Sequence, residues 1–585
     1  MIKYGLALLL GIFFVILSTI INTYIGINFG MGFGFGLLAL IASFIIFKTF
    51  LKNFDRSIVS LVFIIGTSML TIHNILGTGI MLVEKFDVTL PEWFIPSKNI
   101  LEKRMLVPSI WVTPILIIFV INIMSTLLGL LYTITLYKNF IEEERLVFPN
   151  LAASATMMDA LFTGGEEVKI VFLSILTGFT ISLVQQILLL FKINIYYFDL
   201  TPFLPKGIVF AFSLSIGLMA VGYIISASTS LSTFLSGLMT YFIISPYSIS
   251  KGIIPYSKDI QSLYSSLVFK VTLSPAMGIL ILGGIGLSIF GFIMRGKKKH
   301  GYKHGYIDLY YILWRRMIGN KKVFVTMFLL TILLGISVYI LNPLAPLHPF
   351  YSLIFFIYSV FIGSFLELVL LVRMIGESGM GMGIFSIVLY DIPIFLTGYR
   401  AYSGYMTGSM FIPSSWTAPS IIGLMKYNDK FDISLKEIVG GKIVGWIVSF
   451  IVSSITTLLL WRYRGFGTIS MPAVGLLQQA VYINMLAKGN ISGTIDPFTF
   501  IVGGVVGSIL EVATPLSMIG IALGMLIPPQ YVITLGVGGI IRFLTDRKMG
   551  KEYFKKRGML IATGLLTSSL LVEIISIIIR SVQNV

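Results

Sequence analysis

Long apolar segments follow one another along the whole chain, and no other feature constrains the fold as strongly. Most are close to the roughly 20 residues that a helix needs to cross a bilayer core of about 30 Å. Charged residues make up only 11% of the chain and the mean hydropathy is +0.95, whereas soluble domains carry about 25% charged residues. The segments lie at about 4–26, 31–50, 57–83, 108–136, 168–191, 206–226, 229–247, 272–294, 323–341, 347–373, 380–398, 402–425, 438–461, 494–514, 515–543 and 558–580.

This pattern predicts an all-α integral membrane protein, a polytopic bundle of about 15–17 transmembrane helices. The penultimate run is interrupted by Pro528-Pro529 and could form one helix or two. A transmembrane β-barrel is excluded, because its strands are short and alternate in polarity. The polar stretches are too short to form a soluble domain with its own core. The start, Met1-Ile2-Lys3-Tyr4, lacks a small-residue cleavage site, so we expect a retained first helix.

The charge and composition exclude several classes of function. The net charge is +17, but Lys and Arg lie in loops between apolar runs, as the positive-inside rule requires, so we expect no nucleic acid partner. The chain has no Cys, no P-loop and no H-E-x-x-H motif. We therefore predict no enzyme, no cofactor and no bound metal. High Ile and Lys usage is typical of an AT-rich prokaryote. We therefore expect a multi-pass protein of a prokaryotic cell (plasma) membrane.

The second half of the chain repeats features of the first. The stretch from Gly222 to Gly237 matches the stretch from Gly524 to Gly539, with an offset of 302 at both ends. We predict a first transmembrane repeat at 1–300, a basic cytoplasmic loop with a linker helix at 301–345, and a second repeat at 346–585. A single linker crossing favours an inverted repeat, as in many secondary transporters, while a parallel repeat stays open.

Two helix-prone segments are too short to span the membrane. The first, at 150–162, follows the charged run Glu142-Glu143-Glu144-Arg145 and the break at Phe148-Pro149-Asn150. The second, at 472–487, follows Met471-Pro472 and contains Gln478. A broken helix at membrane depth must be buried in protein or line a cavity, and transporters place such helices at the substrate site.

Four motifs, distributed along nearly the whole chain, resemble those of the oligopeptide transporter (OPT) superfamily, in its prokaryotic and yellow-stripe-like branch. They are Asn22 to Met31, Phe148-Pro149 with the following alanines, Arg373 to Met382, and Ile519 to Pro528 followed by Gly538 to Arg547. The chain departs from the family in lacking a Gly-Thr pair after Pro149 and an Asn-Pro pair after Gly379. The resemblance implies proton-coupled symport of small peptides, glutathione-like molecules or metal complexes with amino-acid-derived chelators.

Ionisable side chains within apolar runs are costly and are usually functional. Glu377, Asp159 and Glu511 are candidates for binding a proton or a substrate amine, and the alternative is a paired structural carboxylate. Arg373 could clamp a peptide carboxylate or anchor the cytoplasmic edge. His73 could titrate near neutral pH or be a hydrogen-bonded core histidine. Glu573 is expected to be structural.

Polar and small residues complete the predicted site. Tyr24, Asn22 and Asn28 could line a polar cavity, although Tyr24 also fits an interfacial belt. The motif residues either frame the site or simply let helices pack closely. They are Pro149, Asn150, Gly376, Gly379, Pro472, Gln478 and Pro528.

Together these features predict a secondary active transporter, with a channel or a lipid or polymer flippase as the alternatives. The substrate site would lie between the halves, framed by the short segments after Pro149 and Pro472 and by glycine breaks after Tyr24 and Arg373. The expected partners are a small-molecule or peptide substrate, protons and the lipid bilayer. The substrate, coupling ion, direction of transport and any homo-oligomer stay open.

Overall fold

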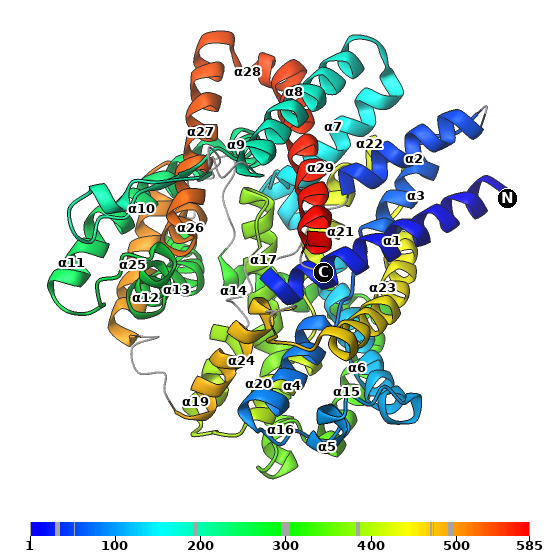
Figure 1. The fold of residues 1–585 in the computed structure, drawn as a ribbon, viewed down its shortest axis with the longest axis vertical. Helices are drawn as coiled ribbons and strands as arrows, with labels where there is room; N and C mark the ends of the chain where they lie inside the picture. Colours follow the sequence, from blue (N-terminus) through cyan, green and yellow to red (C-terminus); the bar gives the residue numbers. More distant parts are fainter. Residues whose placement is uncertain are drawn as a thin grey trace.

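The structure is a computed structural model that describes residues 2–29, 36–51, 53–190, 197–293, 305–381, 387–468, 471, 473–489 and 496–583. Helices dominate these residues, and the two short strands pair antiparallel, with Phe198 opposite Phe212. Figure 1 shows the helices packed into one bundle in which α17 lies near the middle. The prediction of an all-α membrane protein is confirmed.

The elements before residue 300 are α1 (Ile2–Phe29), α2 (Gly36–Phe50), α3 (Arg56–Gly66), α4 (His73–Phe86), α5 (Lys98–Glu102), α6 (Pro108–Lys138), α7 (Pro149–Thr163), α8 (Gly165–Leu190), β1 (Tyr197–Asp199), β2 (Ala211–Ser213), α9 (Ile216–Ile224), α10 (Ala227–Met239), α11 (Ser245–Ser250), α12 (Ile260–Leu267) and α13 (Leu273–Ile293). Helix α7 is the short segment predicted after Phe148-Pro149. The expected run at 57–83 is divided into α3 and α4.

The later elements are α14 (Tyr306–Gly319), α15 (Lys321–Leu341), α16 (Pro349–Tyr358), α17 (Ser364–Ser378), α19 (Ile392–Leu396), α20 (Tyr402–Thr407), α21 (Ala418–Lys426), α22 (Asn428–Phe431), α23 (Leu435–Arg464), α24 (Val474–Ala487), α25 (Pro497–Ala513), α26 (Met518–Leu526), α27 (Pro529–Met549), α28 (Lys551–Tyr553) and α29 (Met559–Gln583). The run interrupted by Pro528-Pro529 forms two helices, α26 and α27. Pro472 lies outside the described residues.

One loop prediction is wrong. Residues 306–319 lie within the stretch expected to be a basic loop, but they form α14. Its buried side chains Tyr306, Leu309, Leu313 and Met317 recur at helical spacing. Arg315 and Arg316 are exposed on the same helix. Because charged residues interrupt the apolar ones, the segment has no continuous apolar run that would indicate a helix in the sequence.

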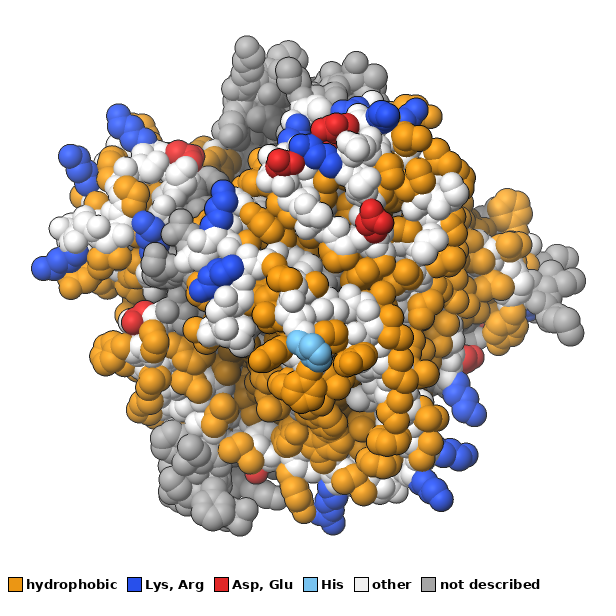
Figure 2. All heavy atoms as spheres, turned by 90° about the horizontal axis from the view of Figure 1, so that it is seen from below, with side chains coloured by type: hydrophobic (Ala, Val, Ile, Leu, Met, Phe, Trp, Pro, Cys, Tyr) orange, Lys and Arg blue, Asp and Glu red, His pale blue; other side chains and the backbone are white. Residues whose placement is uncertain are grey.

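Eight helical segments of the described chain are long and apolar enough to cross a membrane by length and composition. They are Lys3–Asn28, Pro108–Glu143, Gly165–Leu188, Ala227–Ser250, Ser262–Leu287, Lys321–Leu341, Pro349–Ser378 and Leu435–Arg464. Figure 2 shows a face of the molecule that is largely hydrophobic, with Lys and Arg mainly toward its edges. Such an apolar surface suits contact with lipid tails. The larger expected number of crossings stays a prediction.

The two halves place broken helices at matching positions. Helix α9 runs from Ile216 to Ile224 and α26 from Met518 to Leu526, so both bounds differ by 302 residues. After each, a short break leads into a second helix, α10 in the first half and α27 in the second. Thus the sequence repeat marks a repeated helix, break and helix unit.

Contacts between these two units are reciprocal. A Cβ atom at Gly222 would lie 2.2 Å from the carbonyl oxygen of Leu535, and one at Gly524 would lie 2.3 Å from that of Thr233. Thr233 and Leu535 also differ by 302 positions. Each short helix therefore uses its glycine to approach the long helix of the other half, a close packing typical of membrane helices.

The corresponding helices α10 and α27 run antiparallel. Ser230 of α10 lies against Gly539 of α27, whereas Gly237, farther along α10, lies against Val532, nearer the start of α27. Equivalent helices that contact each other in opposite directions are related by a local two-fold axis perpendicular to them. This is the relation expected between inverted repeats.

The glycine contacts predict the effect of adding one methyl group. We expect Gly524→Ala to destabilise the protein by about 1–3 kcal/mol, because the new methyl group would overlap the α10 backbone. Thermal unfolding of the purified protein in detergent would measure this loss.

Gly440→Ala is the matched control, because a Cβ atom at Gly440 of α23 meets nothing within 4 Å. It should keep or slightly raise the stability, since Ala favours helix over Gly. Equal melting temperatures for the two variants would contradict the proposed packing of α26 on α10.

Candidate functional site

A buried ion pair fixes the end of α17 against the charged segment that precedes α7. Arg373 contacts Glu144 through two hydrogen bonds, Nη2 to Oε1 at 2.6 Å and Nε to Oε2 at 3.0 Å. Both side chains are almost completely buried. The guanidinium also lies 5.3 Å from the ring centre of Tyr306, close enough for a cation–π contact. This paired geometry favours neither of the two roles expected for Arg373.

The turn that starts α7 is bonded to α17 as well. The backbone N–H of Phe148 donates to the carbonyl of Gly376 at 2.8 Å, and Nδ2 of Asn150 donates to the carbonyl of Gly379 at 3.0 Å. Phe148 precedes Pro149 with a left-handed φ of 52°. The motifs around Pro149 and Gly376, which are more than 200 residues apart in sequence, therefore meet in one place.

A second set of contacts holds the same turn from its other side. The hydroxyl of Tyr427 donates to the carbonyl of Val147 at 2.6 Å, and Nζ of Lys426 donates to the carbonyl of Leu146. The start of α7 is thus fixed between α17 and the end of α21. A rigid start is what a short helix needs at membrane depth, where unpaired backbone groups are costly.

Glu377 lies one turn after Arg373 and connects α17 to both broken-helix units. Its Oε2 accepts hydrogen bonds from the hydroxyls of Ser517 at 2.7 Å and Thr229 at 3.3 Å. The side chain is buried, with 9% of the residue exposed. The prediction that Glu377 sits in a glycine-rich break is wrong, because α17 continues to Ser378 and only Gly379 leaves the helix, with φ of 74°.

Two helix amino ends converge on this carboxylate. Ser517 is the N-cap of α26 and also accepts from the N–H of Gly520 at 3.2 Å. Thr229 lies in the first turn of α10, which begins after its N-cap Ser226. The amino ends of helices carry partial positive charge, so both favour negative charge at Glu377.

Glu511 reaches the same helix end from α25. Its Oε2 accepts a hydrogen bond from the backbone N–H of Met518 at 2.7 Å. Two of the three predicted carboxylates therefore meet at the first residues of α26. Hydroxyls of α10 line the same end, and Oγ of Ser232 accepts from the N–H of Ser517 at 2.9 Å.

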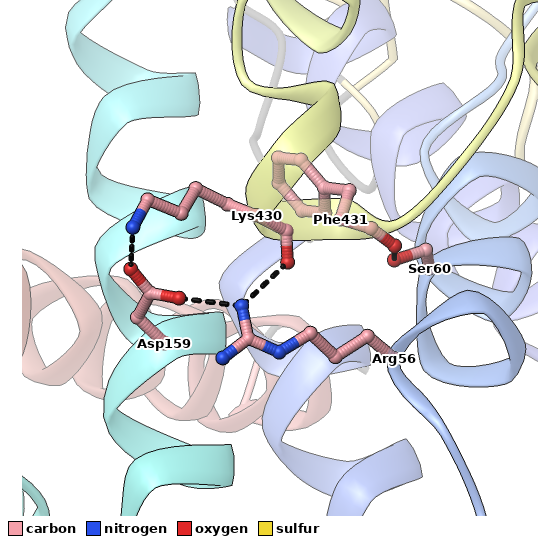
Figure 3. A network of polar contacts seen from close by, with 5 residues as sticks. All are labelled: Arg56, Ser60, Asp159, Lys430 and Phe431. Carbon is pink, nitrogen blue, oxygen red and sulfur yellow. Dashed lines mark hydrogen bonds and ion pairs between the residues drawn. The ribbon is translucent and has the colours of Figure 1, made fainter.

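Asp159, the third predicted carboxylate, lies elsewhere and is paired. It forms ion pairs of 2.6 Å with both Arg56 and Lys430 (Figure 3). Arg56 also donates to the backbone carbonyl of Lys430 at 3.2 Å. The network joins α3, α7 and α22, so the geometry favours the structural alternative for Asp159.

The remaining predicted side chains gather near α24. The Nδ2 of Asn28 donates to the carbonyl of Tyr24 at 3.1 Å, and its Oδ1 accepts from the N–H of Ala473 at 3.3 Å. His73 is buried against Gly26, and its Nδ1 has no hydrogen-bond partner in the part of the chain that the structure describes. Helix α1 continues to Phe29, so the expected break does not begin at Tyr24 or Gly26.

The starts of α7 and α24 resemble each other. Ala473, the N-cap of α24, has a left-handed φ of 50°, close to the value at Phe148 before α7. Near this start, Oγ1 of Thr78 donates to Oε1 of Gln479 at 2.9 Å. The neighbouring Gln478 is exposed.

Three other predicted residues lie apart from these clusters. Asn22 is buried and donates to the carbonyl of Ser18 at 2.9 Å. Pro528 is the residue before α27 and shapes the break between α26 and α27. The side chain of Glu573 lies outside what the structure describes.

Sequence reasoning missed Glu144, Ser517 and Thr229. Glu144 is one of three consecutive glutamates, and only the fold shows which of them turns inward. Ser517 and Thr229 are single hydroxyls among many in apolar runs. The one sequence signal for Ser517 is its N-cap position, since Ser and Thr are preferred before a helix. Thr229 lies in the first turn of α10 and has no such signal. Within the described residues, no group of three or more His, Asp or Glu is arranged to hold a metal ion.

An apolar helical bundle with broken helices in both halves, and a buried carboxylate bonded to two of them, is the architecture of a polytopic membrane protein. The chain matches the model of the family described as OPT oligopeptide transporter protein over residues 6–580, and it belongs to that family. Comparison with curated proteins finds no match. The resemblance to this family, inferred from four motifs, is thus confirmed for nearly the whole chain.

The Arg373–Glu144 pair predicts a strong effect on stability. Removing one partner by Arg373→Met or Glu144→Gln leaves the other buried without its counter-charge, which costs about 3–5 kcal/mol. Thermal unfolding in detergent should show a large loss for each single variant. The double variant Arg373→Met/Glu144→Leu should recover much of it.

The exposed pair of Glu166 and Arg557, at 3.0 Å, provides the control. Glu166→Gln should change the stability little, because exposed ion pairs are weak. If the single variants at Arg373 and Glu144 unfold like wild type, the ion pair does not fix α17.

Proposed function

We propose that this chain is a proton-coupled symporter that carries small peptides, or peptide-like and metal-chelate solutes, across the cytoplasmic membrane of a prokaryote. Membership of the oligopeptide transporter family supports the transport activity. The observation that carries the proton coupling is the contact of Glu377 with Ser517 and Thr229. We assign the chain to the prokaryotic and yellow-stripe-like branch on its motifs.

The chemistry of the contact suits reversible protonation. A hydroxyl can donate to an ionised carboxylate and can also accept from a protonated one. The bonds of Glu377 to Ser517 and Thr229 can therefore survive gain and loss of a proton. The guanidinium of Arg373, one turn earlier, donates two hydrogen bonds to Glu144. Its positive charge is therefore paired with Glu144 as well as lying near Glu377.

The position of Glu377 suits coupling between the halves. We propose repeats at 1–300 and 346–585 in an inverted arrangement, joined by the segment 301–345. Thr229 belongs to the first repeat, whereas Ser517 and Glu377 belong to the second. Neutralising Glu377 would weaken its attraction to both helix amino ends, and a ligand or proton can shift a conformational equilibrium only through such differential contacts.

The other candidate residues take secondary parts in this proposal. Glu511 supports the amino end of α26 beside Glu377. Asp159 and Arg373 stabilise the fold through their ion pairs. Tyr24, Asn28 and His73 line a polar region at α24 that corresponds to the start of α7.

The test is uptake into proteoliposomes with an alkaline interior. The panel contains labelled di- to pentapeptides, glutathione and a metal–chelator complex. We expect wild type to accumulate at least one solute against its gradient, and a protonophore to abolish the accumulation. Glu377→Gln should remove uphill accumulation while leaving folding and downhill exchange intact.

Glu166→Gln on exposed α8 is the control and should transport like wild type. Uphill accumulation by Glu377→Gln would contradict the role of Glu377. Fast, gradient-independent leak would favour a channel, and competition by lipids would favour a flippase.

A further inference from the structure

A lysine is buried within one of the candidate membrane spans. Lys442 lies two turns after the start of α23, and only 3% of the residue is exposed. Its Nζ donates a hydrogen bond to Oγ of Ser420 at 2.8 Å. An ammonium group has three donors, and a serine hydroxyl is a neutral partner. The charge therefore has little compensation.

Among the residues that the structure describes, no carboxylate lies within ion-pair distance of Lys442. Two acidic groups on the elements that pack around α21 and α23 have other partners. Asp159 of α7 pairs with Arg56 and Lys430, and Glu437, which precedes Lys442 on α23, caps its own helix at Ser434. An uncompensated charge in a membrane span costs at least about 2.5–3.5 kcal/mol, so residues that bear this cost are usually functional.

Ser420 places the ammonium beside the amino end of α21. Helix α21 begins at Ala418, and its N-cap Thr417 makes no side-chain capping bond. The Oγ1 of Thr417 is buried without a hydrogen-bond partner in the described part of the protein. A helix amino end next to a buried cation and an unused hydroxyl is a suitable environment for an anion.

A further hydroxyl lies at the same level. Aromatic contacts align α6 antiparallel with α23, since Trp111 pairs with Trp461 at 5.4 Å and Phe119 with Phe450 at 5.0 Å. Continuing this register brings the part of α6 around Thr126 to the level of Lys442. Thr126 is fully buried, and its Oγ1 has no partner among the described residues.

We propose that Lys442, with Ser420 and the amino end of α21, binds a carboxylate group of the transported solute. Every peptide with a free carboxyl terminus supplies such a group. The inference rests on the proposed function and adds the carboxylate subsite to it. Helix α21 also contacts the start of α7, where Gly423 lies against Phe148 and Leu151, so the subsite adjoins the segment bonded to α17.

The experiment compares ligands that differ only in this carboxylate. Trialanine and tetra-alanine, each as the free acid and the C-terminal amide, are titrated against purified protein while its melting temperature is measured, because a ligand of the folded state raises stability. We expect the acids to bind wild type at least about tenfold more tightly than the amides, because the amide lacks the charged group that would accept hydrogen bonds from Lys442. Lys442→Met should remove this difference, and Lys442→Arg should retain part of it.

Lys436→Met is the matched control, since Lys436 is exposed on the same helix, and it should discriminate like wild type. Equal affinity of wild type for acids and amides would overturn the proposal, as would discrimination retained by Lys442→Met. Sodium acetate distinguishes a failure of the carboxylate site at Lys442 from a failure of the proposed peptide transport. If neither acid nor amide binds but acetate stabilises wild type and not Lys442→Met, the carboxylate site stands and peptide transport fails. If acetate also has no such effect, the carboxylate site is refuted.

Discussion

The buried pair of Arg373 and Glu144 is the interaction on which the rest of the site depends. It fixes α17 against the segment before α7, and the backbone bonds from Phe148 and Asn150 to α17 follow from that alignment. Glu377, one turn farther along, is thereby directed to the first residues of α26 and α10. A bidentate arginine–carboxylate contact suits this role because its geometry is specific, and breaking it would leave a buried charge.

The broken helices give that carboxylate its environment. A continuous helix satisfies its backbone groups internally, but a helix that starts inside the protein presents free N–H groups and partial positive charge. The breaks before α10 and α26 place two such starts near Glu377. The reciprocal glycine contacts of α9 with α27 and of α26 with α10 hold the two starts together. Close packing and electrostatics therefore depend on the same repeated unit.

The sequence predicted the class, the short helix α7 and the 302-residue repeat, because hydropathy, proline breaks and glycine spacing are local signals. It also singled out Glu377 and Glu511, which the fold brings together at the start of α26. It did not predict that Glu144 pairs with Arg373 or that Lys442 is buried, because those facts depend on which helices meet. Glu377 was expected in a glycine-rich break, yet Gly376 is helical and accepts a hydrogen bond from Phe148. The helix α14 was missed because exposed arginines interrupt its apolar pattern.

In the proposed mechanism, Glu377 carries the proton that is coupled to the solute. The most direct measurement is the number of protons taken up when a transported peptide binds to purified protein in weakly buffered detergent solution near neutral pH. We expect wild type to take up protons on binding, and Glu377→Gln to bind the peptide without this uptake. The same proton uptake by both proteins would contradict the claim and would place the coupled proton on another group.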